Sequence, residues 1–147
     1  MTSQTLRIRG LLLLLAAALM LASATVGAAD AEADAAPLFI NLITDDPHRA
    51  HMALSFGQKQ LALGHPLTVF LNDRGVLIAA KQGAERFGLH QEIIAELLTA
   101  GAKVIVCPMC MQHYGVAEAD LLDGLAVGNP KLTGGALFAP DTRTLTW

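Results

Sequence analysis

Two cysteines, Cys107 and Cys110, stand three residues apart and are the only thiols in the chain. His113 follows at the same spacing, and Met109 and Met111 flank the second cysteine. Residues three apart on a helix are neighbours on its surface, so the two cysteines and the histidine could share one face. Thiols, an imidazole and thioethers together support nucleophilic, redox or soft-metal chemistry.

These residues allow three chemistries. In sulfur-atom carriage, Cys107 takes up a sulfane sulfur as a persulfide, Cys110 releases it by closing a disulfide, and His113 tunes or deprotonates a thiol. In dithiol–disulfide exchange, the two cysteines alternate between thiol and disulfide. In a metal site, copper or zinc would be bound by the cysteines and His113, with Met109 or Met111 as a thioether ligand.

Two plainer interpretations of the cysteines carry less weight. A structural disulfide between Cys107 and Cys110 would close so small a loop that it restricts the unfolded chain little. Attachment of c-type haem is excluded, because that motif needs histidine at the position of Met111.

The residues around the cysteines predict a strand followed by a helix. The run 103–106 is apolar and β-branched after its first residue, Pro108 fits a first helical turn, and Gly115 fits a helix end. Cys107 is then expected at the helix cap, where free amides and the helix dipole favour a thiolate. In parallel α/β sheets, sites form beyond the carboxyl ends of the strands.

The rest of the chain alternates strands and helices. Helices are predicted at 47–63 and 91–100, with a short one at 118–122. The segment 76–80 is ambiguous between strand and helix, and 130–140 has no predicted element. Strands are predicted at 38–43, 67–71, 103–106, 125–127 and 143–146. This pattern predicts an α/β fold, a three-layer α/β/α sandwich around a mostly parallel sheet of about five strands.

A few other polar residues have predicted places. Asp46 is expected to cap the helix that Pro47 opens. The turn 72–75 ends a strand and could line the same edge as Cys107, although turn chemistry alone accounts for it. His65 and His90 flank predicted elements and are expected at the surface.

The first residues predict export. Arg7 and Arg9 precede an apolar stretch that is too short to span a bilayer and that ends in small residues suited to signal peptidase. We therefore expect periplasmic localisation, with no stable membrane anchor. The predicted divisions are a signal peptide at 1–28, a disordered lead-in at 29–37 and one domain at 38–147.

The charge of the chain argues against nucleic acid as a partner. The formal net charge is −3, and it becomes more negative once the two arginines of the leader are removed. An acidic surface repels phosphates, and a single Trp and a single Tyr offer little for base stacking.

Five segments, in their order and spacing, resemble the DsrE/DsrF/YchN-like (DsrE) family over nearly all of the predicted domain. The resemblance implies a compact DsrEFH-like α/β sandwich that assembles into homo-oligomers, trimers or hexamers. The segments are Pro47–Ala50, Gly64–Leu71, Gly75–Val76, Gly101–Cys107 and Gly115–Gly124.

The same resemblance implies persulfide transfer in sulfur oxidation or thiolation relays. In relay members the sulfur-carrying cysteine lies eight residues before a glycine, which corresponds here to Cys107 and Gly115. Cys110 matches a second cysteine that some members have. The implied protein is a sulfurtransferase-like carrier rather than a stand-alone enzyme, and its implied partners are sulfur donor and acceptor proteins or small sulfane-sulfur compounds.

Overall fold

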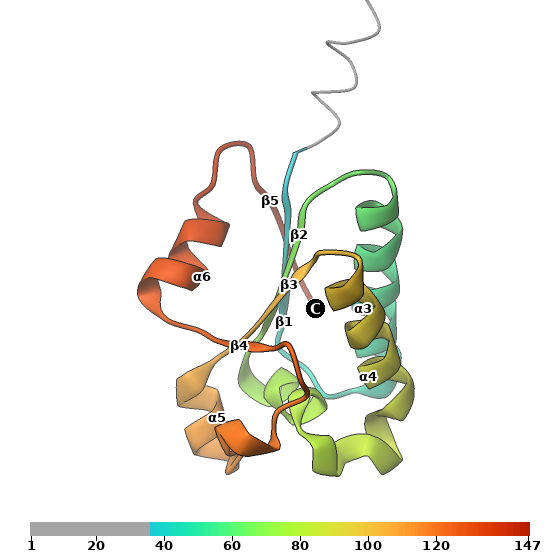
Figure 1. The fold of residues 1–147 in the computed structure, drawn as a ribbon, viewed down its shortest axis with the longest axis vertical. Helices are drawn as coiled ribbons and strands as arrows, with labels where there is room; N and C mark the ends of the chain where they lie inside the picture. The colour runs from blue at the N-terminus through green and yellow to red at the C-terminus, as the bar shows by residue number, and fades with distance from the viewer. Residues whose placement is uncertain (1–35) are drawn as a thin grey trace, which may run out of the picture. The chain divides into compact units, whose positions relative to one another are not determined.

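A computed structural model describes residues 36–147. The predicted signal peptide, 1–28, and most of the lead-in predicted at 29–37 lie outside the described residues. The described chain forms one five-stranded sheet in the order β4-β3-β2-β1-β5, and every pairing in it is parallel (Figure 1). The strands are β1 (Leu38–Leu42), β2 (Leu67–Leu71), β3 (Lys103–Val106), β4 (Ala126–Val127) and β5 (Arg143–Thr146).

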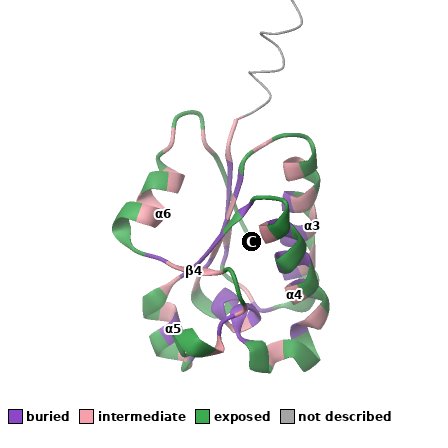
Figure 2. Ribbon diagram, viewed as in Figure 1, coloured by how far each residue is buried: buried purple, intermediate pink, exposed green. Residues whose placement is uncertain are grey.

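One face of the sheet carries the core. Side chains alternate between the two faces of a strand, and the adjacent inner strands β1 and β2 place four fully buried residues on this face, Ile40, Leu42, Val69 and Leu71. Two long helices, α3 (Pro47–Ala62) and α4 (Ala84–Thr99), cover it (Figure 1). Figure 2 shows the buried residues along the strands and along the sides of these helices.

Helix α3 begins as the sequence predicts. Asp46 caps it, because its carboxylate accepts a hydrogen bond from the Arg49 amide at 2.8 Å, and Pro47 occupies the first turn. Gly57 lets the helix approach the sheet closely, since an added Cβ would lie 3.0 Å from side-chain atoms of Ile40 and Leu67.

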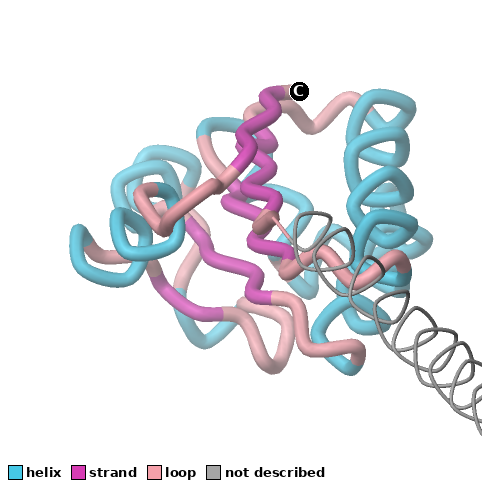
Figure 3. The backbone as a smooth tube through the Cα atoms, turned by 90° about the horizontal axis from the view of Figure 1, so that it is seen from above, coloured by secondary structure: helices cyan, strands magenta, loops and turns pink. Residues whose placement is uncertain are grey.

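The opposite face of the sheet is covered less completely. Helix α6 (Pro130–Leu137) lies on this side (Figures 1 and 3), and none of its own residues is buried. Asn129 caps α6 by accepting a hydrogen bond from the Leu132 amide at 2.9 Å. The helix falls in the segment 130–140, for which the sequence predicted no element. With helices on both faces of a parallel sheet, the predicted three-layer α/β/α sandwich is confirmed.

Short helices gather beyond the carboxyl ends of the strands. They are the 3₁₀ helices η2 (Asp73–Ala79), η3 (Lys81–Gly83) and η4 (Glu118–Asp120), and the α-helix α5 (Pro108–Tyr114). The ambiguous segment 76–80 is therefore mostly 3₁₀ helix, and the short helix predicted at 118–122 is a single 3₁₀ turn. Among residues 36–147, we find no helix with the length and apolar character needed to span a bilayer.

The prediction for the helix at 91–100 was wrong at its start. Helix α4 begins at Ala84 rather than at Gln91, and it therefore includes His90. This histidine is 4% exposed and faces the core side of the helix, so its predicted surface position is also wrong. Its Nε2 lies 2.7 Å from the carbonyl oxygen of Pro47, at the start of α3.

Candidate functional site

Cys107 lies at the junction between β3 and α5, as the sequence predicts. Its amide donates to the carbonyl of Leu71 at 3.0 Å, which extends the strand pairing by one residue before the chain turns. Cys107 is then the N-cap of α5, with Pro108 in the first turn. Gly115 ends the helix in the left-handed conformation, at a φ of 70°, which glycine adopts without steric cost.

The two thiols meet at this junction. The sulfur of Cys110 lies 2.7 Å from Cys107 Sγ, and the Cys110 amide points at Cys107 Sγ from 3.4 Å. Both cysteines are free and partly exposed. Two donors of Cys110 lie within reach of Cys107 Sγ: the backbone amide, and the single thiol proton, which can be donated either to Cys107 Sγ or to Asn72 Oδ1.

Cys110 is also held by the turn that follows β2. Its thiol lies 3.0 Å from Asn72 Oδ1, and its sulfur accepts the Asp73 amide at 3.2 Å. Burial, followed by the hydrogen bond to Cys107, raises the pKa of Cys110 to about 11. Cys110 is therefore a protonated thiol at neutral pH. The prediction that the turn 72–75 lies at the same edge as the cysteines is confirmed.

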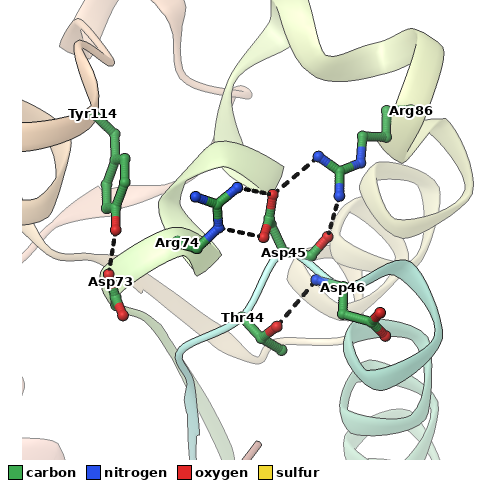
Figure 4. A network of polar contacts seen from close by, with 7 residues as sticks. All are labelled: Thr44, Asp45, Asp46, Asp73, Arg74, Arg86 and Tyr114. Carbon is green, nitrogen blue, oxygen red and sulfur yellow. Dashed lines mark hydrogen bonds and ion pairs between the residues drawn. The ribbon is translucent and has the colours of Figure 1, made fainter.

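The side chain of Asp73 is hydrogen-bonded to the last residue of α5. Its backbone adopts a φ of 47°, a left-handed conformation that is uncommon outside glycine. The Tyr114 hydroxyl donates to the Asp73 carboxylate at 2.5 Å (Figure 4). The same contact raises the pKa of Tyr114. This bond fixes the residue whose amide points at Cys110.

A buried carboxylate anchors the next residue of the turn. Asp45 accepts two hydrogen bonds from Arg74, at 2.6 and 2.9 Å, and a third from Arg86 of α4 at 3.0 Å (Figure 4). The bond from Arg74 is the main cause of the lowered pKa of Asp45. Sequence reasoning assigned no place to this ion-pair cluster. The available signal was an aspartate just beyond a buried strand, where a carboxylate needs partners.

The other predicted site residues do not join the two sulfurs. His113 is exposed and its ring lies edge-on to Tyr114, with centroids 4.7 Å apart; within residues 36–147 no hydrogen bond joins it to either cysteine. Met109 is 79% exposed, whereas Met111 is 6% exposed and packs into the core.

The spacing of the two sulfurs differs from the spacing of two thiolates on a zinc ion. Two thiolates on one tetrahedral zinc ion lie about 3.8 Å apart, given Zn–S bonds of about 2.3 Å. The sulfurs of Cys107 and Cys110 are 2.7 Å apart, which is closer than this spacing. Over the described part of the chain, no three His, Cys, Asp or Glu residues are grouped closely enough to hold a metal ion.

A parallel α/β domain with a reduced cysteine pair beyond its third strand defines a class of small thiol proteins. The DsrE/DsrF-like family model matches residues 37–138, and the chain belongs to this family. The chain is 33% identical over 90 residues to the uncharacterized protein MJ0989 of Methanocaldococcus jannaschii, covering 58% of this chain and 79% of that protein. It is 28% identical over 88 residues to the uncharacterized protein MK0008 of Methanopyrus kandleri, covering 57% of this chain and 73% of that protein.

Solved structures share the fold at low sequence identity. Protein MTH1491 of Methanobacterium thermoautotrophicum superposes with a TM-score of 0.62 at 16% identity, covering 76% of this chain and 99% of that one. The YchN protein of E. coli gives a TM-score of 0.56 at 16% identity, with the same two coverages. Protein BT1422 of Bacteroides thetaiotaomicron gives a TM-score of 0.59 at 19% identity, covering 76% of this chain and 94% of that one.

Proposed function

We propose that this DsrE/DsrF-like protein is a periplasmic sulfur carrier in which Cys107 holds a persulfide and Cys110 discharges it. The contact between the two sulfurs carries the proposal: the Cys110 thiol lies 2.7 Å from Cys107 Sγ, at a partly exposed strand end. Membership of the family supports sulfur-relay chemistry at this place. The proposed partners are a donor of sulfane sulfur, an acceptor of the released sulfide, and a thiol that reduces the disulfide.

Loading of the carrier is a nucleophilic displacement. The Cys107 thiolate attacks a sulfane sulfur of the donor, a sulfur–sulfur bond of the donor breaks, and the shortened donor leaves with the electron pair. Cys107 is the better attacking group because it lies at the partly exposed start of α5 with the Cys110 amide directed at its sulfur, whereas Cys110 is protonated at neutral pH. Loading needs one thiolate and leaves the resolving thiol unchanged.

Discharge uses the second thiol. Cys110 attacks Cys107 Sγ of the persulfide, a disulfide forms between the cysteines, and the outer sulfur leaves as hydrogen sulfide together with the proton of Cys110. The contact already brings the two sulfurs together, so little movement is needed before the bond forms. A reductant must then reopen the disulfide before the next cycle.

The same contact supports dithiol–disulfide exchange as a second candidate function. A pair that closes and reopens without carrying sulfur would also place its thiols side by side at a helix start. The two functions differ in one product, because only the carrier gains a sulfur atom on Cys107.

Intact-mass measurement after exposure of the reduced protein to inorganic polysulfide tests the carrier. We expect the Cys110→Ser variant to gain the mass of one sulfur atom and the Cys107→Ser variant to gain none, because the raised pKa of the remaining Cys110 keeps it protonated and the hydroxyl of serine is a poor nucleophile. His113→Ala, measured in parallel in the Cys110→Ser background, tests the predicted modulating base. If Cys110→Ser gains no sulfur, or if Cys107→Ser gains as much, the carrier function is wrong.

A further inference from the structure

The side chain of Asn72 contacts both the turn at the end of β2 and the thiol of Cys110. Asn72 follows β2 directly and caps η2, where its Oδ1 accepts the Asp73 amide at 2.9 Å. The same oxygen lies 3.0 Å from the sulfur of Cys110 and can accept its single thiol proton, for which Cys107 Sγ is the alternative acceptor. Its Nδ2 points toward Asn41 Oδ1 of β1 at 3.5 Å, which orients the amide.

The hydrogen bond from Cys110 to Asn72 exists in only one redox state. A thiol can donate to an amide oxygen, whereas a disulfide has no proton to donate. When the pair closes, Asn72 Oδ1 loses the donor from Cys110 and keeps only the Asp73 amide. This interaction therefore stabilises the dithiol and contributes nothing comparable to the disulfide.

Asn72 does not bring the two cysteines together. Their proximity is set by the first turn of α5, in which Cys107 is the cap and the Cys110 amide faces its sulfur at 3.4 Å. Loss of the Asn72 amide is therefore expected to change the energy of the thiol form more than the geometry of closure.

We infer that Asn72 is a positioning residue that favours the dithiol over the disulfide by accepting the thiol proton of Cys110. The inference rests on the proposed function in taking Cys110 as the resolving thiol, and it adds a means of regulation. A carrier can accept sulfane sulfur only while Cys107 is free. In an oxidising compartment, a residue that opposes closure keeps the pair ready for loading.

The equilibrium between dithiol and disulfide can be measured in glutathione buffers with no sulfur donor present. Closure transfers two electrons to glutathione disulfide, and the two thiol protons end on two molecules of glutathione. We expect Asn72→Ala to shift the equilibrium constant about fivefold toward the disulfide, because one thiol hydrogen bond is lost. This corresponds to a potential about 20 mV more negative, at about 30 mV per tenfold.

A second substitution should act in the opposite direction. Asn72→Asp keeps the size and the acceptor oxygen but adds charge, and a carboxylate accepts hydrogen bonds more strongly than an amide. We expect this variant to shift the equilibrium toward the dithiol. Asn129→Ala is the matched control, because it removes the asparagine cap of α6 without touching the thiols, and it should leave the equilibrium unchanged.

Shifts of opposite sign in the two Asn72 variants would support the inference. Equal dithiol–disulfide equilibrium constants in the native protein and both Asn72 variants would overturn it, as would shifts of the same sign in Asn72→Ala and Asn72→Asp. If Asn72→Ala does not fold by circular dichroism, the sign of the Asn72→Asp shift decides alone. Because no sulfane sulfur is present, failure of the carrier function in the mass experiment would leave this result unaffected.

Discussion

Replacing Cys110 with serine is expected to lengthen the lifetime of a persulfide on Cys107 on the order of a thousandfold, because discharge changes from an intramolecular to an intermolecular reaction. In the native protein the resolving sulfur lies 2.7 Å from Cys107 Sγ, so the attack needs no diffusion. Serine keeps the size and the hydrogen-bonding capacity of the side chain, but its hydroxyl does not displace sulfide at neutral pH.

The measurement is the rate of hydrogen sulfide release after removal of excess donor, with the protein's redox state read by mass in the same samples. Native protein should release one sulfide for each disulfide that forms. Gln112→Ala, an exposed change on the same helix, should behave as native protein. Equal release rates for native protein and Cys110→Ser would mean that Cys110 is not the resolving thiol.

The Gly75→Ala substitution is expected to lower the free energy of unfolding by about 3 kcal/mol. Gly75 lies in η2 as the last residue of the turn 72–75, whose first two residues contact Cys110, and it packs against the backbone at the end of β1. An added Cβ would collide with the carbonyl oxygen of Leu42, which cannot move without disturbing the strand. Relief of the collision must shift η2, and with it Asn72 and Asp73.

Chemical denaturation compares Gly75→Ala with a matched glycine in the same domain. Gly88 lies within α4 and an added Cβ there meets nothing within 4 Å, so Gly88→Ala should raise the free energy of unfolding by about 0.5–1 kcal/mol. Opposite signs for the two variants are the expected result. A Gly75→Ala protein as stable as the native one would show that η2 is not fixed against β1.

The fold was predictable where an apolar run indicates a strand or helix and a glycine or proline marks its end. The strands Leu38–Leu42 and Lys103–Val106 are mostly apolar runs that lie close to a proline or glycine at each end, and Gly115 marks the end of α5. The early start of α4 was not predictable in the same way, because its first turns are polar and include Gly88. Their helical state depends on contacts such as Gln91 to the carbonyls of Ile78 and Ala80.

The site was predictable only as far as local sequence determines it. The spacing of Cys107 and Cys110 and the proline between them were enough to predict a capping cysteine with its partner one turn away. The contacts from Asn72 and Asp73 come from another strand end, and the register of β2 against β3 determines them. Tertiary pairing of this kind leaves no periodic signal in the sequence.

The central claim is that Cys107 is the reacting sulfur and that Cys110 is a protonated resolving thiol. The most direct test is alkylation of the reduced protein with limiting iodoacetamide, followed by peptide mapping. Because the pKa of Cys110 is raised to about 11, its thiolate is scarce near neutral pH and becomes abundant only in strong alkali. We predict that near neutral pH the label is found on Cys107, and that Cys110 is labelled only as the pH approaches 11. Labelling of Cys110 first, or of both cysteines equally, near neutral pH would contradict the claim.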